Sequence, residues 1–191
     1  MQKKWNIHQI QHVEEVSSLQ TALSVDATIA KLLSLRGIKT FEDAKTFFRP
    51  SLDMLHDPFL MKGMSVAVER IVKAIANKEK VLIFGDYDVD GTTSVALVYS
   101  FFKKYIPEMR YYIPDRYAEG YGISFKSIDY AAENNYALII ALDCGIKAND
   151  KIDYANSKNV DFIICDHHLP GDEIPKAVAV LDPKQHDCPY P

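Results

Sequence analysis

Three clusters of carboxylates and imidazoles directly follow short apolar runs of this 191-residue sequence, at 81–84, 138–142 and 161–165. Together the clusters comprise Asp86, Asp88, Asp90, Asp143, Asp166, His167 and His168. Like charges crowded in a partly desolvated site repel one another unless a cation lies between them. Carboxylates with one or two imidazoles suit Mn²⁺ or Mg²⁺, and two such ions about 3.5–4 Å apart promote phosphoryl chemistry. The clusters therefore indicate metal-dependent hydrolysis of a phosphate ester.

Other sites and a purely structural interpretation compete with this one. Residues 86–91 resemble a calcium-binding EF-hand loop, but Leu97 occupies the position where that loop needs a glutamate. A haloacid-dehalogenase-type phosphatase would use Asp88 as its nucleophile, but three residues separate Asp88 from the apolar run, and Asp143 would be unexplained. A zinc site lacks the paired Cys-x-x-Cys spacing, although four ligands can be chosen: Cys165, His167, His186 and Cys188. A solvated acidic turn remains the structural alternative.

The segment 114–122 is a candidate substrate loop. Arg116 could bind a phosphate, and Tyr117 or Tyr121 could stack on a base. A helix expected to begin near Thr92 would offer backbone N–H groups to a phosphate. The alternative for 114–122 is an ordinary glycine-rich loop.

Alternation of apolar runs with helical periodicity predicts an α/β fold. Strands are expected at 81–84, 110–113, 138–142, 161–165 and 178–181, and helices at about 92–105, 124–134 and 148–158. Strands that are apolar on both faces and separated by helices predict a five-stranded, mainly parallel sheet with helices on both faces. Functional residues gather at the carboxyl ends of such strands, so the three clusters should meet at one edge.

A small helical region, residues 1–62, is expected before an α/β domain at 63–191. Asp26 can cap one of its helices, and Thr40 with Asp43 resembles a capping box. From Ser65 onward, one helix face should comprise Val68, Ile71, Val72 and Ile75.

The composition is that of a soluble globular protein, with 48% hydrophobic and 25% charged residues. Three widely spaced cysteines form no disulfide framework and fit a reducing compartment. No apolar run approaches the roughly 20 residues that span a bilayer, and no apolar signal region follows the N-terminal lysines. We therefore expect a cytoplasmic protein that does not bind a membrane. A net charge of −4 does not indicate nucleic-acid binding, but a metal would neutralise many of the acidic residues.

Taken together, these motifs resemble the DHH phosphoesterase superfamily, which is named for the triplet at 166–168. The match runs in order from about Leu32 to the last residue. It includes Phe84 to Gly91, Pro114-Asp115-Arg116, Glu119 to Gly122, Asp143-Cys144-Gly145, the triplet, and Asp182-Pro183-Lys184. Within the superfamily, the resemblance is to the bacterial exonucleases that act on single-stranded DNA.

The resemblance implies a 5′-to-3′ exonuclease that acts on single-stranded DNA in DNA repair and recombination and uses two Mn²⁺ or Mg²⁺ ions. Its implied metal ligands are Asp88, Asp90, Asp143 and His167, with Asp86 as a ligand or a partner of one, and His168 as a contact to the scissile phosphate. Arg116 would be a second phosphate contact. Implied partners are single-stranded DNA, a single-strand-binding protein and a helicase.

Two departures qualify the resemblance. Many superfamily members have a histidine where this chain has Phe84, so one metal site is expected to be weaker or to use Asp86. The family supplies a further aspartate and a second domain downstream, so the domain at 63–191 is expected to be incomplete at its C-terminus and inactive alone. A nanoRNA or cyclic-dinucleotide phosphodiesterase of the same superfamily is the alternative function, and an inactivated replication scaffold is a third.

Overall fold

The computed structural model describes residues 4, 6 and 13–191. Contacts divide the chain into two compact units, Met1–Leu55 and His56–Pro191. Residues 56–62 group with the second unit, where Lys62 Nζ lies 2.7 Å from a carboxylate oxygen of Asp187. The division at 55/56 therefore lies before the expected boundary at 62/63, and the expected domain extents stay a prediction.

The first unit is helical. It contains α1 (Val13–Leu23), α2 (Ala27–Leu35), α3 (Phe41–Phe48) and the short 3-10 helix η1 (Leu52–Met54). Asp26 caps α2 by accepting a hydrogen bond from the Thr28 N–H at 2.7 Å, and Thr40 with Asp43 forms the predicted capping box on α3. Its small core is made of Val16, Leu19, Ala30, Leu33, Ile38 and Ala44. Within the described residues, no helix has both the length and the apolar character needed to cross a membrane.

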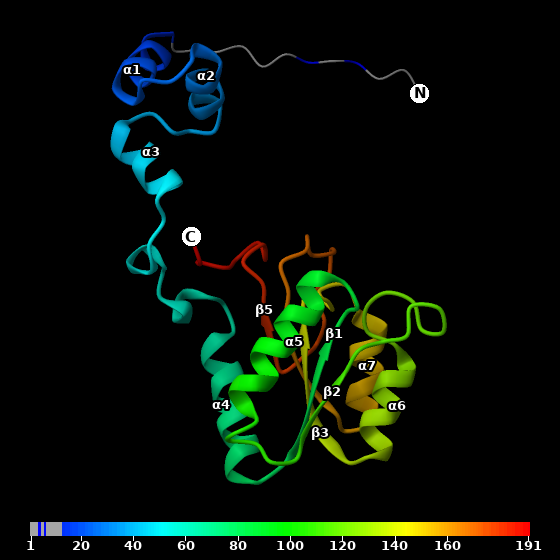
Figure 1. Cartoon of the computed structure of the whole chain (residues 1–191). Coiled ribbons are helices and arrows are strands. Elements are labelled where there is room, and N and C mark those ends of the chain that lie inside the picture. Colours follow the sequence, from blue (N-terminus) through cyan, green and yellow to red (C-terminus); the bar gives the residue numbers. More distant parts are fainter. Residues whose placement is uncertain (1–3, 5, 7–12) are drawn as a thin grey trace. The chain divides into compact units, whose positions relative to one another are not determined.

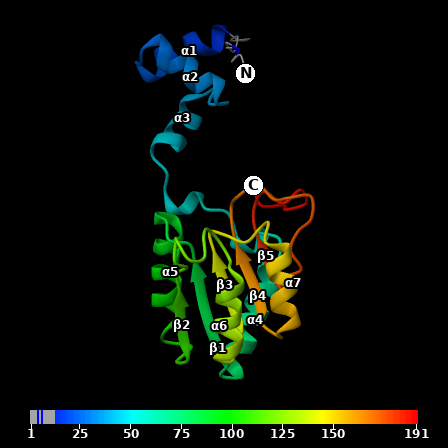
Figure 2. The same ribbon diagram turned by 90° about the vertical axis from the view of Figure 1, so that its right-hand side faces the viewer.

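The second unit is built on a five-stranded sheet, as predicted. Its strands are β1 (Lys80–Gly85), β2 (Met109–Tyr112), β3 (Tyr136–Leu142), β4 (Asp161–Cys165) and β5 (Ala179–Leu181). Their order is β2-β1-β3-β4-β5, and every neighbouring pair is parallel (Figure 2). Because all strands run the same way, their carboxyl ends lie at one edge.

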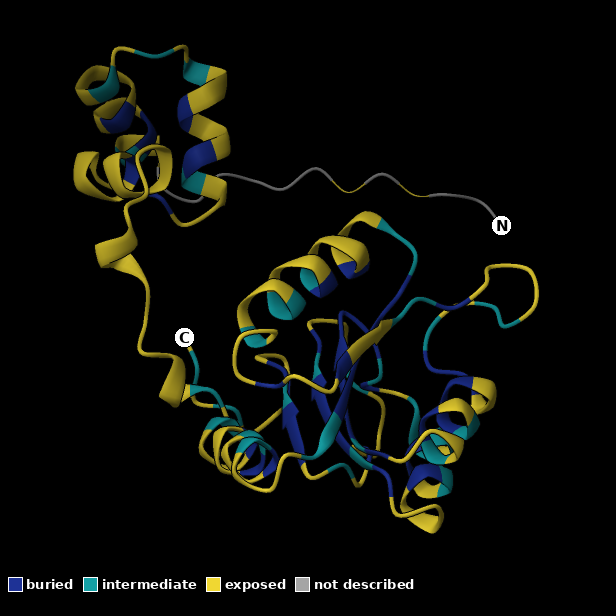
Figure 3. Ribbon diagram, turned by 60° about the horizontal axis from the view of Figure 1, so that its bottom comes forward, coloured by how far each residue is buried: buried dark blue, intermediate teal, exposed yellow. Residues whose placement is uncertain are grey.

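Helices cover both faces of this sheet. The 3-10 helix η2 (Pro58–Leu60) precedes α4 (Met64–Ala76), which packs with α5 (Val89–Phe102) on one face. On the opposite face lie α6 (Phe125–Glu133) and α7 (Asn149–Ser157) (Figure 1). Alternate residues of β1 serve the two faces: Val81 and Ile83 face α4 and α5, whereas Leu82 and Phe84 face α6 and α7. The strands are accordingly mostly buried, except that the edge strand β2 exposes Arg110 and Tyr111, and the helices are exposed on their outer sides (Figure 3).

The buried face of α4 agrees only in part with the expected one. Ile71 and Ile75 pack against the core as predicted, whereas Val68 and Val72 are 38% and 58% exposed. Ala67, Arg70 and Ala74 are buried instead, and the two small alanines allow the helix backbone to lie close to the sheet. The apolar periodicity therefore predicted two of the four contact residues correctly.

Arg70 is the one charged residue that α4 buries. Its Nε lies 2.6 Å from Asp161 Oδ2 at the start of β4, and its Nη2 lies 2.7 Å from Glu79 Oε2 just before β1. The guanidinium also donates to the Ala137 carbonyl of β3 at 3.4 Å. One planar, multiply donating group thus ties the helix to the amino ends of three neighbouring strands.

We expect Arg70→Ala to lower the free energy of unfolding by about 2–3 kcal/mol, because it leaves Glu79 and Asp161 without their buried partner. Part-exposure of Asp161 keeps the loss below that of a fully buried pair. Urea unfolding followed by circular dichroism measures it. Lys73→Ala is the matched control, since it removes a positive charge from an exposed position of the same helix. Equal stability of the two variants would contradict the structural role of the pair.

Candidate metal centre

Four aspartates form a row at the carboxyl edge of the sheet. Gly85, Leu142, Cys165 and Leu181 are aligned across β1, β3, β4 and β5 by the parallel register. The residue that follows the end of each strand is an aspartate, and all four are buried: Asp86, Asp143, Asp166 and Asp182. Carboxylates placed so close together and so far from water need strong local compensation.

Two members of the row are compensated by backbone N–H groups. Asp86, which is fully buried, accepts hydrogen bonds from the N–H groups of Tyr87 and Gly122. Asp166 accepts from the N–H groups of Ile146, His167 and His168 at 2.7–3.1 Å. Burial raises the pKa of Asp166, but these bonds and the hydrogen bond to the His168 ring outweigh burial, so the pKa is lowered.

Asp182 is compensated only in part. Its Oδ1 accepts from the Lys184 N–H at 2.7 Å, but its buried Oδ2 has no hydrogen-bond partner. Burial is the main reason why the pKa of Asp182 is raised. The aspartate of the Asp182-Pro183-Lys184 motif therefore shapes the loop after β5 rather than facing solvent.

Asp143 is the least compensated member of the row. Its backbone has a φ of 60°, a left-handed conformation that is uncommon for a non-glycine residue. Its carboxylate has one neighbour at ion-pair distance, His167 Nε2 at 2.9 Å. Burial, and then the charge of Asp88, raise the pKa of Asp143, and the two histidines offset this only partly. A cation at this carboxylate would remove the cost of keeping it charged.

Among the described residues, one group of side chains is close enough to hold a metal ion together. It consists of Asp143, His167 and His168, and one ligand atom from each lies within 4.8 Å of the others. His168 Nδ1 lies 2.7 Å from Asp166 Oδ1, which orients the ring and leaves Nε2 available. This hydrogen bond is the main reason why the pKa of His168 is raised. A histidine held in this way suits contact with a phosphate oxygen.

Asp88 and Asp90 enter from the first turn of α5. Asp88 is the N-cap of this helix, since its Oδ1 accepts from the Gly91 N–H at 2.9 Å, and Asp90 lies exposed in the first turn. The charges of both raise the pKa of Asp143. Gly91 is required here, because a Cβ would lie 2.6 Å from the Asp86 backbone nitrogen. The expectation of a helix start near Thr92 was wrong: α5 begins at Val89 and the Thr92 N–H already bonds to the Asp88 carbonyl at 3.0 Å, so Thr92 offers no free N–H to a phosphate.

The loop 114–122 is held by a buried glutamate that the sequence did not single out for a role. The Glu119 side chain is 3% exposed. It accepts hydrogen bonds from the Tyr112 hydroxyl at 3.0 Å, the Asp115 N–H at 3.0 Å and the Ser124 hydroxyl at 2.6 Å. Burial alone would raise the pKa of Glu119, but these bonds lower it. Burial and the adjacent Glu119 carboxylate raise the pKa of Tyr112 to about 12.

The three predicted substrate residues of this loop lie differently. Tyr121 reaches the metal centre, where its hydroxyl lies 3.3 Å from Asp88 Oδ2, and burial and then the charge of Asp88 raise its pKa. Arg116 stacks on the Tyr87 ring, with its guanidinium carbon 4.5 Å from the ring centroid. Tyr117 is 96% exposed and is not brought to the centre.

The cysteines do not form the alternative zinc site. Cys144 is buried, and burial raises its pKa well above the ordinary value, so it is an inert thiol rather than a nucleophile. Burial likewise raises the pKa of Cys165 to about 12. Cys188 Sγ instead lies near the Lys62 N–H at 3.4 Å and Met61 Sδ at 3.8 Å. Among the described residues, these thiols belong to no metal-ligand group.

The donor set at the carboxyl edge fits a divalent cation. Several oxygen ligands with one imidazole suit Mn²⁺ or Mg²⁺ better than Zn²⁺, which prefers sulfur and nitrogen. Asp86 makes two backbone hydrogen bonds and supports the neighbouring loops, so its assignment as a ligand stays a prediction, as do those of Asp88, Asp90, Asp143 and His167. Phe84, which stands where many superfamily members have histidine, is buried and stacks on Tyr112.

Three residues that shape the site were assigned no individual role from the sequence, although Asp166 was counted in the acidic clusters: Glu119, Asp166 and Asp182. Glu119 and Asp182 lie in recognised motifs, and Asp166 begins the triplet, but their roles depend on contacts with distant segments. An acidic residue immediately after an apolar strand was the available signal for Asp166 and Asp182. No local pattern distinguishes Glu119 from a solvated loop residue.

The chain matches the model of a known protein family. The model of the DHH family, N-terminal domain, matches residues 80–189. Two curated relatives are single-stranded-DNA-specific exonucleases called RecJ. The one from Bacillus subtilis (strain 168) is 39% identical over 98% of this chain and 24% of its own length, and the one from Escherichia coli (strain K12) is 30% identical over 94% and 30%. The chain thus spans about a quarter to a third of the length of these relatives.

Two solved structures share the fold. A crystal structure of exonuclease RecJ bound to manganese superposes with a TM-score of 0.63 at 26% identity, covering 70% of this chain and 34% of that one. The RecJ of Thermus thermophilus in complex with Mn²⁺ gives a TM-score of 0.67 at 23% identity, covering 91% and 24%, and supports the fold alone. The resemblance stated from the motifs is therefore confirmed.

The Glu119 network predicts a pH-dependent contribution to stability. Glu119→Gln should lower the free energy of unfolding by about 1–2 kcal/mol at neutral pH, because an amide nitrogen replaces one acceptor oxygen and a donor is left unpaired. The folded-state pKa of Glu119 is lowered from its ordinary 4.5, so the charged form's contribution is present above that pH and is lost as the pH falls through the folded value.

Urea unfolding of the wild type and Glu119→Gln between pH 7 and pH 3 measures this difference. Glu133→Gln, an exposed glutamate of α6, is the control and should have little effect at either pH. A difference between wild type and Glu119→Gln that stays constant down to pH 3 would show that the charge of Glu119 is unimportant.

Proposed function

The chain belongs to the DHH family, and we propose that it provides the catalytic front part of a metal-dependent phosphodiesterase, a 5′-to-3′ exonuclease that acts on single-stranded DNA in repair and recombination. One observation carries the proposal. Among the described residues, Asp143 is buried, left-handed and at ion-pair distance from His167 alone, beside Asp88 and Asp90. The two curated relatives named above, which are exonucleases, support the choice of substrate.

We assign metal binding to Asp88, Asp90, Asp143 and His167, with Asp86 holding their loops in place. Mn²⁺ or Mg²⁺ bound there would lower the pKa of water and offset charge that develops on the phosphate. His168, oriented by Asp166, contacts the scissile phosphate, and Arg116 is a second phosphate contact on the loop that Glu119 holds. Tyr121, hydrogen-bonded to Asp88, positions that carboxylate.

The expected setting of the activity follows from the same family. We propose a cytoplasmic enzyme whose substrate is single-stranded DNA and whose protein partners are a single-strand-binding protein and a helicase. A nanoRNA or cyclic-dinucleotide phosphodiesterase would use the same centre with short substrates, and the second experiment below distinguishes the two.

We expect the 191-residue chain to bind Mn²⁺, and Asp143→Asn to weaken binding by about tenfold or more, since loss of even an outer partner costs about 10–100-fold. Mn²⁺ at a concentration of about 100 times Kd should stabilise the wild type by about 2.7 kcal/mol. Electron paramagnetic resonance of free Mn²⁺ measures binding, and thermal melting measures stability.

Asp153→Asn, which neutralises an exposed aspartate of α7, is the control for charge and should bind Mn²⁺ as the wild type does. If Asp143→Asn and Asp153→Asn bind Mn²⁺ equally well, the carboxyl edge of the sheet is not the metal centre. No nuclease activity is needed for this test.

The substrate is tested with the full-length protein in Mn²⁺. A 5′-labelled single strand, its duplex and a labelled dinucleotide are compared, with Asp143→Ala as the inactive control. We expect the single strand to lose its label as mononucleotide while the duplex survives. Cleavage of the dinucleotide alone would instead establish a small-substrate phosphodiesterase, and no cleavage at all would indicate a scaffold.

A further inference from the structure

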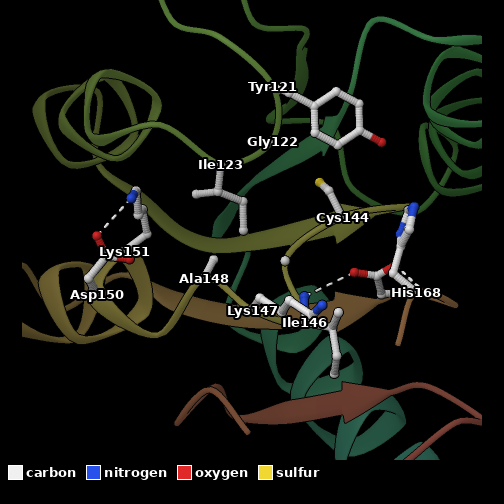
Figure 4. Close-up of a pocket in the computed structure, with 12 residues that line it drawn as sticks. Tyr121, Gly122, Ile123, Cys144, Ile146, Lys147, Ala148, Asp150, Lys151 and His168 are labelled. Atoms are coloured by element: carbon white, nitrogen blue, oxygen red, sulfur yellow. Dashed lines mark hydrogen bonds and ion pairs between the residues drawn. The ribbon is translucent and has the colours of Figure 1, made fainter. Parts of the chain in front are cut away.

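A pocket of about 360 Å³ adjoins the metal centre on the side of α6 and α7 (Figure 4). It shares Asp166 and His168 with the centre, and Tyr121 lies on its wall. We call it the lysine pocket, after Lys147 and Lys151 in its lining. Neither lysine has a role in the proposed function.

The wall of the lysine pocket nearest the sheet is apolar and firmly built. Ile123, Cys144 and Ile146 line it, and all three are buried in the core beneath α6 and α7. Gly145, with a φ of 115°, brings the backbone so close that a Cβ would lie 3.0 Å from Ile123 Cδ1. The wall therefore presents a preformed apolar surface of the kind that ligand pockets use to hold a ring.

Positive charge is placed at the far end of this wall. Figure 4 shows Lys151 and His168 at opposite ends of the lining, with Ile123, Cys144 and Ala148 between them. The Lys151 side chain is only 29% exposed; its Nζ lies 4.9 Å from the centre of the Phe125 ring and 2.7 Å from Asp150 Oδ2. Lys151 is thus held in position before any ligand arrives, whereas Lys147 is exposed.

We propose that the lysine pocket binds one nucleotide of the substrate strand, with its sugar and base against the apolar wall and the phosphate next to the scissile one against Lys147 and Lys151. This inference rests on the proposed function, since it assumes that the scissile phosphate lies against His168. A strand in that position must continue along one side of the centre. A volume near the lower end of the roughly 300–1,000 Å³ range of ligand pockets suits one nucleotide rather than several.

The charge pattern supports a phosphate at this end. The chain carries a net charge of −4, and the row of aspartates makes the neighbouring edge strongly acidic. A strand with a phosphate at every nucleotide needs local cations next to such an edge. Asp150 weakens the attraction between Lys151 and a phosphate, because its carboxylate already pairs with the Lys151 ammonium group. Removing the Asp150 charge should therefore strengthen phosphate binding, whereas removing Lys151 should weaken it.

The test measures binding of thymidine 5′-monophosphate to the 191-residue chain in EDTA, by NMR titration, beside thymidine and inorganic phosphate. We expect the monophosphate to bind more tightly than either. Lys151→Met should weaken its binding about five- to tenfold, as expected for a charge-assisted contact. Asp150→Asn should strengthen it, because Lys151 is released.

Lys158→Met is the matched control, because Lys158 also lies against an aromatic ring, 5.1 Å from the Tyr154 centroid, and pairs with a carboxylate, Asp129 at 3.4 Å. It stands at the opposite end of α7 and should leave binding unchanged. Amide signals of Ile146 and Ala148 report whether each variant keeps its fold and where the ligand binds.

Equal binding of the monophosphate by Lys151→Met and the wild type would overturn the inference. If inorganic phosphate binds as tightly as the monophosphate, the apolar wall does not contribute to binding. If thymidine binds as tightly as the monophosphate, the lysines do not contribute. Because EDTA excludes the metal, binding of the monophosphate together with no nuclease activity of the full-length protein in Mn²⁺ would refute the proposed function and not the pocket. Active enzyme with no monophosphate binding would refute the pocket alone.

Discussion

The register of the parallel sheet is the constraint on which the site depends. Gly85, Leu142, Cys165 and Leu181 are aligned, so the four aspartates that follow them must lie side by side at the carboxyl edge. Backbone hydrogen bonds hold two of these aspartates in register with the neighbouring strand. The Asp143 N–H donates to the Cys165 carbonyl at 2.8 Å, and the Asp166 N–H donates to the Leu181 carbonyl at 3.0 Å. A slip of one residue in any strand would move its carboxylate out of the row.

The surroundings of the row give its members different tasks. Asp86 and Asp166 are compensated by backbone N–H groups and so hold neighbouring loops in place. Asp143 lacks such donors, which makes it the carboxylate with most to gain from a cation. The row is therefore uneven: the chain itself stabilises Asp86 and Asp166 with backbone donors, Asp182 only in part, and Asp143 through His167.

Much of this arrangement could be predicted from the sequence. Apolar runs that end in aspartate predicted the strands and the shared edge, because in a parallel sheet strand direction alone determines where those ends lie. The face of α4 could be predicted only in part. Ile71 and Ile75 pack on the core as expected, but Val68 and Val72 fit the helical period as well as Ala67 and Ala74 do, and only the close packing on the sheet distinguishes them. Glu119 was hidden for the same reason: its donors come from Tyr112, Asp115 and Ser124, which the loop brings together only in the folded protein.

Hydrogen bonds connect the loop 114–122 to the metal centre. Gly122 donates its N–H to Asp86 and Tyr121 lies at hydrogen-bond distance from Asp88, so the segment that presents Arg116 is fastened to the acidic turn that follows β1. Glu119 fixes the other end of that segment to β2 through Tyr112. A shift of the loop would therefore displace Arg116 and disturb the carboxylates at the same time, and a change in the carboxylates would in turn affect the loop. Two clusters that lie far apart in the sequence are coupled because one buried aspartate and one buried glutamate each need donors that this loop supplies.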